Sequence, residues 1–235
     1  MKSSIKEVSE QIYRISIDIP ANEIPVPGGF SFNQYLLVDE SPTLFHTGSR
    51  PFFPFVKEQI EKVIPVSHLR YIGFSHYEQD ECGAMNEFLQ AAPQAAPLCG
   101  RIAAMTNGPG FDRAPKAMGE GETLNIGRKT LRWLDAAHLP HGWDCGYLFE
   151  EKTRSLFCGD LFTQPGAGLD ALTEGDILGP SEAMRAGMDY FAHGPSSRPL
   201  LQKLANTQPA LLACMHGSAW RGNGVKLLAD LAALL

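Results

Sequence analysis

The sequence lacks the features that would assign it to several common classes of protein. It contains no run of 18 apolar residues and no apolar segment near its N-terminus, which argues against a membrane-spanning helix and a signal peptide. Its 20 basic residues are outnumbered by 26 acidic ones and form no block, so neither nucleic acid nor an anionic membrane is expected as a partner. From these absences we expect a cytoplasmic protein.

Cysteine motifs and nucleotide-binding motifs are absent as well. The five cysteines form no C-x-x-C pair and no dense cluster, which argues against a disulfide framework and against a zinc knuckle. No G-x-G-x-x-G pattern occurs, so no bound nucleotide is expected. No repeat, linker or low-complexity tract divides the chain, and its length suits one large α/β domain. We therefore expect residues 1–235 to form a single domain with free, buried thiols.

Apolar periodicity predicts strands and helices that alternate in both halves of the chain. Ile15, Ile17 and Ile19 lie at alternate positions, as on one face of a strand, whereas Met85 and Phe88 have helical spacing. The predicted strands are 11–20, 32–40, 43–48, 69–76, 96–100, a hairpin over 122–136, 145–151, 155–160 and 210–216. The predicted helices are 52–64, 81–92, 101–105, 180–192, 197–206 and 221–235. This alternation favours two sheets packed together with helices outside.

A histidine and two carboxylates follow the apolar strand that ends at Phe74. In "FSHYEQDECG" they occupy every second position, as His76, Glu78 and Asp80. Residues two apart share a face of a strand, and in a loop that leaves a strand they can curl around one point. One imidazole with two carboxylates is a ligand mix that suits iron or manganese rather than structural zinc. The alternative is that the acidic residues simply begin the next helix, where they complement the helix dipole.

Three further strands end in potential metal ligands. His138 and His141 follow "TLRWL", Asp160 follows "LFCG", and His216 follows "LLACM". An unpaired aspartate at the end of a buried strand is costly unless it meets a cation or hydrogen-bond donors. Four strand ends with potential ligands indicate a metal site more strongly than any one of them does.

The order H-x-E-x-D, then His, Asp and His, resembles the motifs of the metallo-β-lactamase fold family. Most hydrolases of that family have a second histidine where this chain has Glu78, and a glutamate there is the signature of the diiron branch, the flavodiiron proteins. Two local matches support that branch, because "HGWD" at 141–144 is similar to its H-W-P-D and "HGSAWR" at 216–221 resembles its H-G-P-x-W-R. The resemblance covers essentially the whole chain. It implies an α/β fold, the αββα sandwich of two mixed β-sheets flanked by helices.

The resemblance also implies a dinuclear site with two iron ions joined by an oxo or hydroxo bridge. The implied ligands are His76, Glu78 and His141 for one iron, Asp80 and His216 for the other, and Asp160 as a bridge. Carboxylates suit such a site because they spread negative charge over two hard cations. Zinc and manganese are the alternative metals.

The identity of one histidine ligand and the roles of two other residues stay open at this stage. His141 fits the flavodiiron spacing, with 18 residues before Asp160, whereas His138 fits the wider family, in which a ligand histidine is followed two residues later by proline. Whichever is not a ligand could orient a ligand or bound oxygen. Glu81 stands where the family usually has histidine and could bind the second iron, hold a water or begin the helix. Tyr77 could donate its O–H to bound oxygen or serve in packing.

By this resemblance the protein would bind or reduce O2, with NO as a second ligand. Flavodiiron proteins carry a flavodoxin domain after the last histidine, and this chain stops 19 residues after His216, which predicts no flavodoxin domain. In this respect it resembles the stand-alone oxygen-binding diiron proteins. We therefore expect an oxygen sensor or carrier with a signalling partner, or an oxidoreductase supplied by a separate electron-transfer protein, and a homodimer is compatible with either.

Two other classes of function compete with this reading. A dinuclear zinc site with a bridging hydroxide would hydrolyse an ester, thioester or lactam. Glu78 argues against it, because zinc is better served by a histidine-rich shell. A metal-free interaction domain on the same fold would leave the ligand residues without a purpose.

Overall fold

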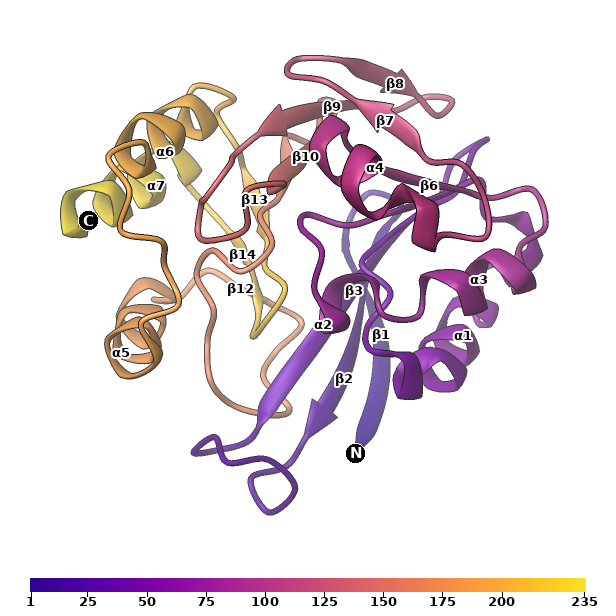
Figure 1. The fold of residues 1–235 in the computed structure, drawn as a ribbon. Coiled ribbons are helices and arrows are strands. Elements are labelled where there is room, and N and C mark those ends of the chain that lie inside the picture. Colours follow the sequence, from indigo (N-terminus) through magenta and orange to yellow (C-terminus); the bar gives the residue numbers. More distant parts are fainter.

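Two seven-stranded sheets face each other in the computed structural model, which describes all 235 residues (Figure 1). The strands of the first sheet lie side by side in chain order: β1 (Lys2–Ser9), β2 (Ile12–Ile19), β3 (Phe30–Leu37), β4 (Thr43–Phe45), β5 (Tyr71–Gly73), β6 (Ala96–Gly100) and β7 (Lys116–Met118). Strands β1 to β4 pair antiparallel and β4 to β7 pair parallel, so this sheet is mixed.

The second sheet is also mixed and holds the C-terminal strands in the order β12-β14-β13-β11-β10-β9-β8. These strands are β8 (Thr123–Asn125), β9 (Thr130–Asp135), β10 (Gly146–Glu150), β11 (Ser155–Phe157), β12 (Leu172–Thr173), β13 (Leu211–Ala213) and β14 (Ala219–Arg221). The pair β11 and β13 is parallel, so their carboxyl ends lie next to each other. That register brings the loops after Phe157 and Ala213 to one point.

Helices cover the outer face of each sheet. The first sheet carries α1 (Phe53–Glu61), α2 (Gln79–Cys82), α3 (Met85–Ala91) and α4 (Arg101–Asn107), and the second carries α5 (Leu178–Met188), α6 (Ser197–Ala205) and α7 (Gly224–Leu234). Short 3-10 turns lie at Arg50–Phe52, Val66–His68 and Gly108–Gly110. A third apolar cluster, with Tyr35, Trp133 and Phe157, fills the space between the sheets. The layers are therefore α, β, β, α, which confirms the predicted sandwich.

Several element boundaries differ from those that the sequence predicts. The edge strand β1 was not predicted, because most of its residues are exposed or half-buried and its sequence is polar. The helix expected over 81–92 is two helices, since Ala84 N–H donates to Gly48 O and leaves the helical ladder. The helix expected over 180–192 ends at Met188, where Asp189 takes a left-handed conformation. The helix expected over 221–235 begins at Gly224, capped by the Asn223 side chain.

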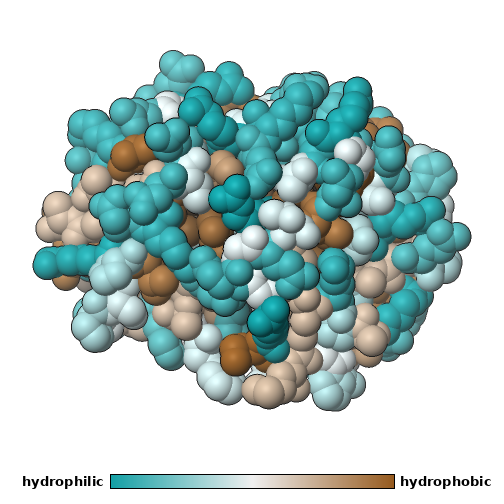
Figure 2. Space-filling view, turned by 90° about the horizontal axis from the view of Figure 1, so that it is seen from above, coloured by the Kyte–Doolittle hydropathy of each residue, from teal (hydrophilic) through white to brown (hydrophobic).

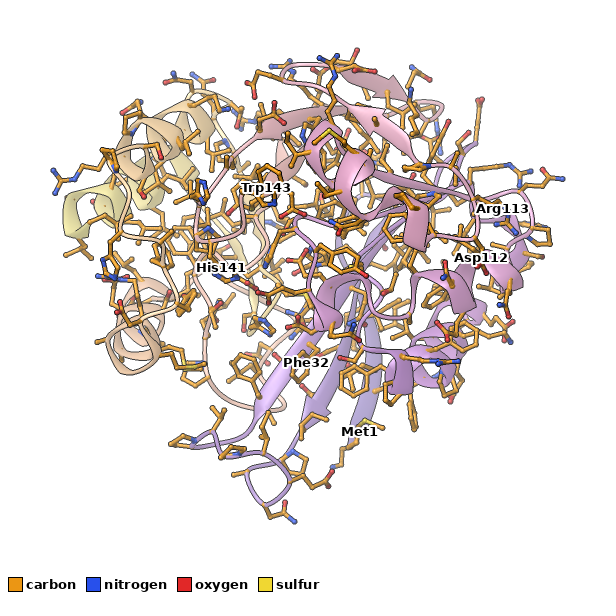
Figure 3. All side chains as sticks on the ribbon, viewed as in Figure 1. Met1, Phe32, Asp112, Arg113, His141 and Trp143 are labelled. Carbon is orange, nitrogen blue, oxygen red and sulfur yellow. The ribbon has the colours of Figure 1, made fainter.

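No helix is both long enough and apolar enough to span a membrane. Figure 2 shows one face of the molecule as mostly hydrophilic, with hydrophobic residues scattered over it. The candidate ligands follow strands of the two sheets, and His141 lies left of centre in Figure 3, between the N-terminal elements and the C-terminal helices.

Candidate metal centre

The loop from β5 to α2 carries three of the candidate ligands. The His76 side chain is buried, whereas that of Glu78 is 46% exposed and that of Asp80 24% exposed. Main-chain N–H of Tyr77 donates to Asp144 Oδ2 at 3.1 Å, which ties this loop to the loop between β9 and β10. The alternation predicted from the sequence thus becomes a curl, with its polar side chains directed inward.

The loop between β9 and β10 brings His141, and not His138, to the same place. His141 Nδ1 donates to the Tyr190 carbonyl at 2.8 Å, which leaves Nε2 directed toward His76 and Asp160. His138 is exposed and lines a different cavity, with Glu120 and Lys203. The structure thereby separates two histidines that the sequence leaves as alternatives.

Asp160 follows β11 across a sharp turn. Gly159 has φ +47°, and a Cβ at that position would lie 2.6 Å from Ser75 Oγ, so only glycine fits there without displacing the neighbouring loop. The Asp160 carbonyl accepts a hydrogen bond from Thr163 Oγ1 at 2.7 Å. The Asp160 side chain is 9% exposed, so its charge sits in a largely dry environment.

The loop after β13 is fixed by buried polar groups that reach it from β2 and β3. His216 Nδ1 donates to Ser31 O at 2.8 Å, and Gly217 N–H donates to Ser31 Oγ at 2.8 Å. Arg14 Nη2 and Asn33 Nδ2 both donate to the Gly217 carbonyl, at 2.7 and 2.8 Å. The His216 imidazole is therefore held with Nε2 directed at the carboxylates of Asp80 and Asp160.

One group of candidate ligand atoms lies around Asp160 Oδ2. Donor atoms of His76, Glu78, His141 and Asp160 all lie within 4.8 Å of one another. Asp160 Oδ2 is 3.5 Å from His76 Nε2 and 3.4 Å from His141 Nε2. Glu78 Oε1 is 3.1 Å from His141 Nε2 and 3.6 Å from His76 Nε2. Two imidazoles and two carboxylates thus surround one point.

A second group lies on the other side of the same aspartate. Asp160 Oδ1, the opposite carboxylate oxygen, is 3.3 Å from His216 Nε2. Asp80 Oδ2 is 3.5 Å from the same nitrogen. The two oxygens of Asp160 therefore face two different sets of candidate ligands.

The charges packed within the cluster shift the pKa values of its members. The neighbouring His141 and His76 imidazoles lower the pKa of Glu78 to about 2. Burial would lower the pKa of His216, but the Asp160 and Asp80 carboxylates raise it to about 10. Burial would raise the pKa of Asp160, yet His216 and His76 hold it well below its usual range. The pKa values of the Glu78 and Asp160 carboxylates are thus lowered, and that of the His216 imidazole is raised in compensation.

The donor set fits metal ions for a second, independent reason. Three buried atoms of the cluster have no hydrogen-bond partner: His76 Nε2, His141 Nε2 and Asp160 Oδ1. Buried polar atoms are rarely left unpaired, because each one costs free energy. In all three histidines Nδ1 has a partner, so Nε2 is free to face the centre, and engagement of the second nitrogen is the usual arrangement of a metal-bound imidazole.

Other residues singled out from the sequence lie outside the cluster. Tyr77 is half-exposed, packs against Phe111 and lines a neighbouring cavity, so its role at a metal stays a prediction. Glu81 is fully buried and turns away from the cluster, toward Ser75 and the back of His76. Ser31 and Tyr190 could not be predicted from the sequence, because each pairs with a histidine Nδ1 through its main-chain carbonyl, which leaves no signal in the residue type. The Ser31 hydroxyl also accepts a hydrogen bond from Gly217 N–H.

Comparisons with known proteins give the family and the fold of the chain. A protein-family model described as "ODP family beta lactamase" matches residues 30–217. An anaerobic nitric oxide reductase flavorubredoxin from Salmonella arizonae is 25% identical over 240 residues, which covers 97% of this chain and 49% of the relative. The chain thus spans about half the length of that curated relative.

Solved structures share the fold at low sequence identity. Rubredoxin oxygen:oxidoreductase from Desulfovibrio gigas superimposes with a TM-score of 0.82 at 21% identity, over 98% of this chain and 62% of that one. The flavodiiron protein from Giardia intestinalis superimposes with a TM-score of 0.80 at 20% identity, over 99% of this chain and 59% of that one. The order of strands and the four layers are therefore those of these longer proteins.

Proposed function

The chain belongs to the ODP family of β-lactamase-fold proteins, and from that premise we propose that it is a non-haem diiron protein that binds or reduces O2. The names of similar proteins support a diatomic gas as the ligand. One is a nitric oxide reductase and another is an oxygen oxidoreductase, so NO is the second candidate.

The orientation of Asp160 is the observation that carries this proposal. Its Oδ2 faces His76 and His141, while its Oδ1 faces His216. A carboxylate with oxygens directed at two sets of donors is suited to join two metal ions. We assign His76, Glu78 and His141 to the first metal position and Asp80 and His216 to the second, with Asp160 shared between them.

The donor types favour iron over zinc. Taken together, the two positions contain three carboxylates and three imidazoles. This mixture suits iron or manganese, whereas zinc is better served by a histidine-rich set of ligands. When bound, two iron ions would supply the one-electron redox chemistry and the site for the gas. The chain's own residues set the geometry, because the Nδ1 hydrogen bonds of the three histidines fix the direction of each Nε2 lone pair.

We further propose that electrons for turnover come from a separate redox protein, and that without it the protein acts as an O2 carrier or sensor. The test is stopped-flow mixing of reduced, iron-loaded protein with O2, followed by measurement of O2 consumption with NADH alone. A lasting O2-dependent absorption change with negligible consumption supports binding without turnover. Sustained O2 consumption with NADH alone would show instead that the protein is an oxidase that needs no separate redox protein.

Two controls make this experiment specific to the proposed centre. Asp160→Asn should lack both metals and show no O2-dependent absorption change. Zinc-loaded wild-type protein should show no hydrolysis of thioester, ester or lactam substrates. Efficient hydrolysis by the zinc form, with no response of the iron form to O2, would establish the competing function.

A further inference from the structure

A buried carboxylate lies behind His76, on the side of the imidazole that faces away from the cluster. Glu81 Oε2 accepts hydrogen bonds from main-chain N–H of Ser75 at 2.7 Å and of His76 at 3.0 Å. Glu81 Oε1 accepts from Ser75 Oγ at 2.6 Å and lies 3.3 Å from His76 Nδ1. The side chain is fully buried, and the only side chains that form ion pairs with it are two imidazoles.

The Ser75 hydroxyl connects the Glu81 carboxylate to the His76 imidazole through two hydrogen bonds. A serine hydroxyl has one hydrogen to donate, and Glu81 Oε1 at 2.6 Å is its acceptor. Ser75 Oγ must then accept from His76 Nδ1, which is 2.9 Å away. The neutral imidazole is thereby held with its proton on Nδ1 and its lone pair on Nε2, facing the first metal position.

The other two histidines do not depend on a side chain in this way. His141 Nδ1 pairs with the Tyr190 carbonyl and His216 Nδ1 with the Ser31 carbonyl. A carbonyl can only accept, so it fixes the proton on Nδ1 under all conditions. A serine hydroxyl can also donate, so without Glu81 it could turn and place the His76 proton on Nε2, where it would compete with a metal.

His46 is the second imidazole that faces Glu81. It is fully buried, its Nε2 lies 3.5 Å from Glu81 Oε2, and neither of its ring nitrogens has a hydrogen-bond partner. Its backbone has φ +67°, a left-handed conformation that is uncommon for residues other than glycine. This conformation, which costs free energy, places an imidazole beside a carboxylate that has no lysine or arginine near it.

We propose that Glu81 is a positioning residue for the first metal position: through Ser75 it holds His76 in the form that can bind a metal, and His46 flanks it from the other side. This inference rests on the ligand assignment of the proposed function. It gives Glu81 a role other than that of a ligand of the second metal, because its carboxylate is turned away from Asp80 and His216 and bound on both oxygens.

The test is a titration of metal-free protein with Zn(II) against a competing chelator, with Glu81→Gln compared with wild type. Zinc is a suitable probe because it has no redox chemistry. Loss of an outer-shell partner typically weakens metal binding by about 10- to 100-fold, and we expect a loss of that size at the first position only. His76→Ala identifies which of the two binding events belongs to that position.

A control variant and an NMR measurement distinguish a specific effect of Glu81 on His76 from a general destabilisation of the fold. Glu150 is also a fully buried glutamate, hydrogen-bonded to Lys152 and Thr153 far from the cluster, so Glu150→Gln should leave both zinc events unchanged. In the zinc-loaded protein, the His76 Nδ1 proton resonance should move to higher field in Glu81→Gln. Those of His141 and His216 should not move.

Each outcome decides between the two proposals. Wild-type affinity at both positions in Glu81→Gln, or equal weakening of both, would overturn the positioning role and leave the proposed function intact. Failure of the wild-type chain to bind two metals would overturn both. If Glu81→Gln does not fold, Ser75→Ala carries the test, with weakening of the first position expected and unchanged affinity overturning the inference.

Discussion

The two proposed metal positions would share Asp160 but differ in how the chain builds them. The first draws His76, Glu78 and His141 from two loops, and both of its imidazole Nε2 atoms are buried without a partner. The second has only Asp80 and His216 besides the shared carboxylate. The first position thus has four protein donors and the second has three. We therefore expect the first position to bind its metal more tightly and the second to keep room for a small ligand.

The two positions also differ in what supports them. His216 is fixed by main-chain and side-chain groups of β2 and β3, in the first sheet, although it follows a strand of the second. His76 is supported within its own loop, by Ser75 and Glu81. The orientation of His216 thus depends on contact between the sheets, whereas that of His76 depends on the local conformation of residues 74–81.

Removal of the shared carboxylate should have the largest effect, because it breaks both positions at once. If a four-ligand zinc site binds with about 10–16 kcal/mol, each ligand accounts for about 3 kcal/mol, or about 100-fold in affinity. Asp160→Asn should therefore lose both metals, measured by metal analysis after gel filtration. Asp135→Asn, on an exposed aspartate, is the control. Retention of two metals by Asp160→Asn would show that Asp160 does not bridge.

Removal of one histidine from each position should separate them. We expect His216→Ala to keep one metal and His76→Ala to lose the tighter-bound one, because each leaves the other position with its remaining donors. Isothermal titration of the metal-free variants with Zn(II) would count the sites and rank their affinities. Equal losses in the two variants would mean that the positions bind as one cooperative unit.

A smaller but sharper comparison is that of His141 with His138. His141→Ala should weaken the first position by about 100-fold, the share of one ligand, because its Nε2 lies 3.1 to 3.4 Å from Glu78 and Asp160. His138→Ala should bind metal as wild type does, since His138 is exposed and belongs to another cavity. The same titration measures both, and metal loss in His138→Ala would reverse the assignment.

The last comparison concerns folding stability rather than metal affinity, in the pH dependence of the metal-free protein. The folded-state pKa of His216 is about 10, against about 6.5 for an unfolded histidine. Its contribution to stability is therefore fully present below about pH 6.5 and is lost as the pH rises toward 10. The melting temperature of chelator-treated protein should fall over that range, and less so in His216→Ala. A melting temperature that stays constant from pH 6 to 10 would contradict a raised pKa of His216 in the folded protein.

The clustering of the candidate ligands could largely be predicted from the sequence, because polar residues at strand ends leave a pattern of residue types. The choice between His138 and His141 could not, since both follow β9 and the decision lies in a turn where His138 takes φ +65°. The direction of Glu81 could not be predicted either, because a helix start and a metal ligand demand the same residue type. Short strands such as β12 and β14 escaped prediction because two or three residues carry no periodicity.

Metal analysis of protein purified from iron-supplied cells, combined with Mössbauer spectroscopy, tests the central claim most directly. The proposed ligand sets predict close to two iron ions per chain, in two inequivalent environments that are magnetically coupled through the shared carboxylate. Two zinc ions per chain in an enzyme that hydrolyses a thioester or lactam would contradict the diiron assignment, and a single iron would contradict the second position.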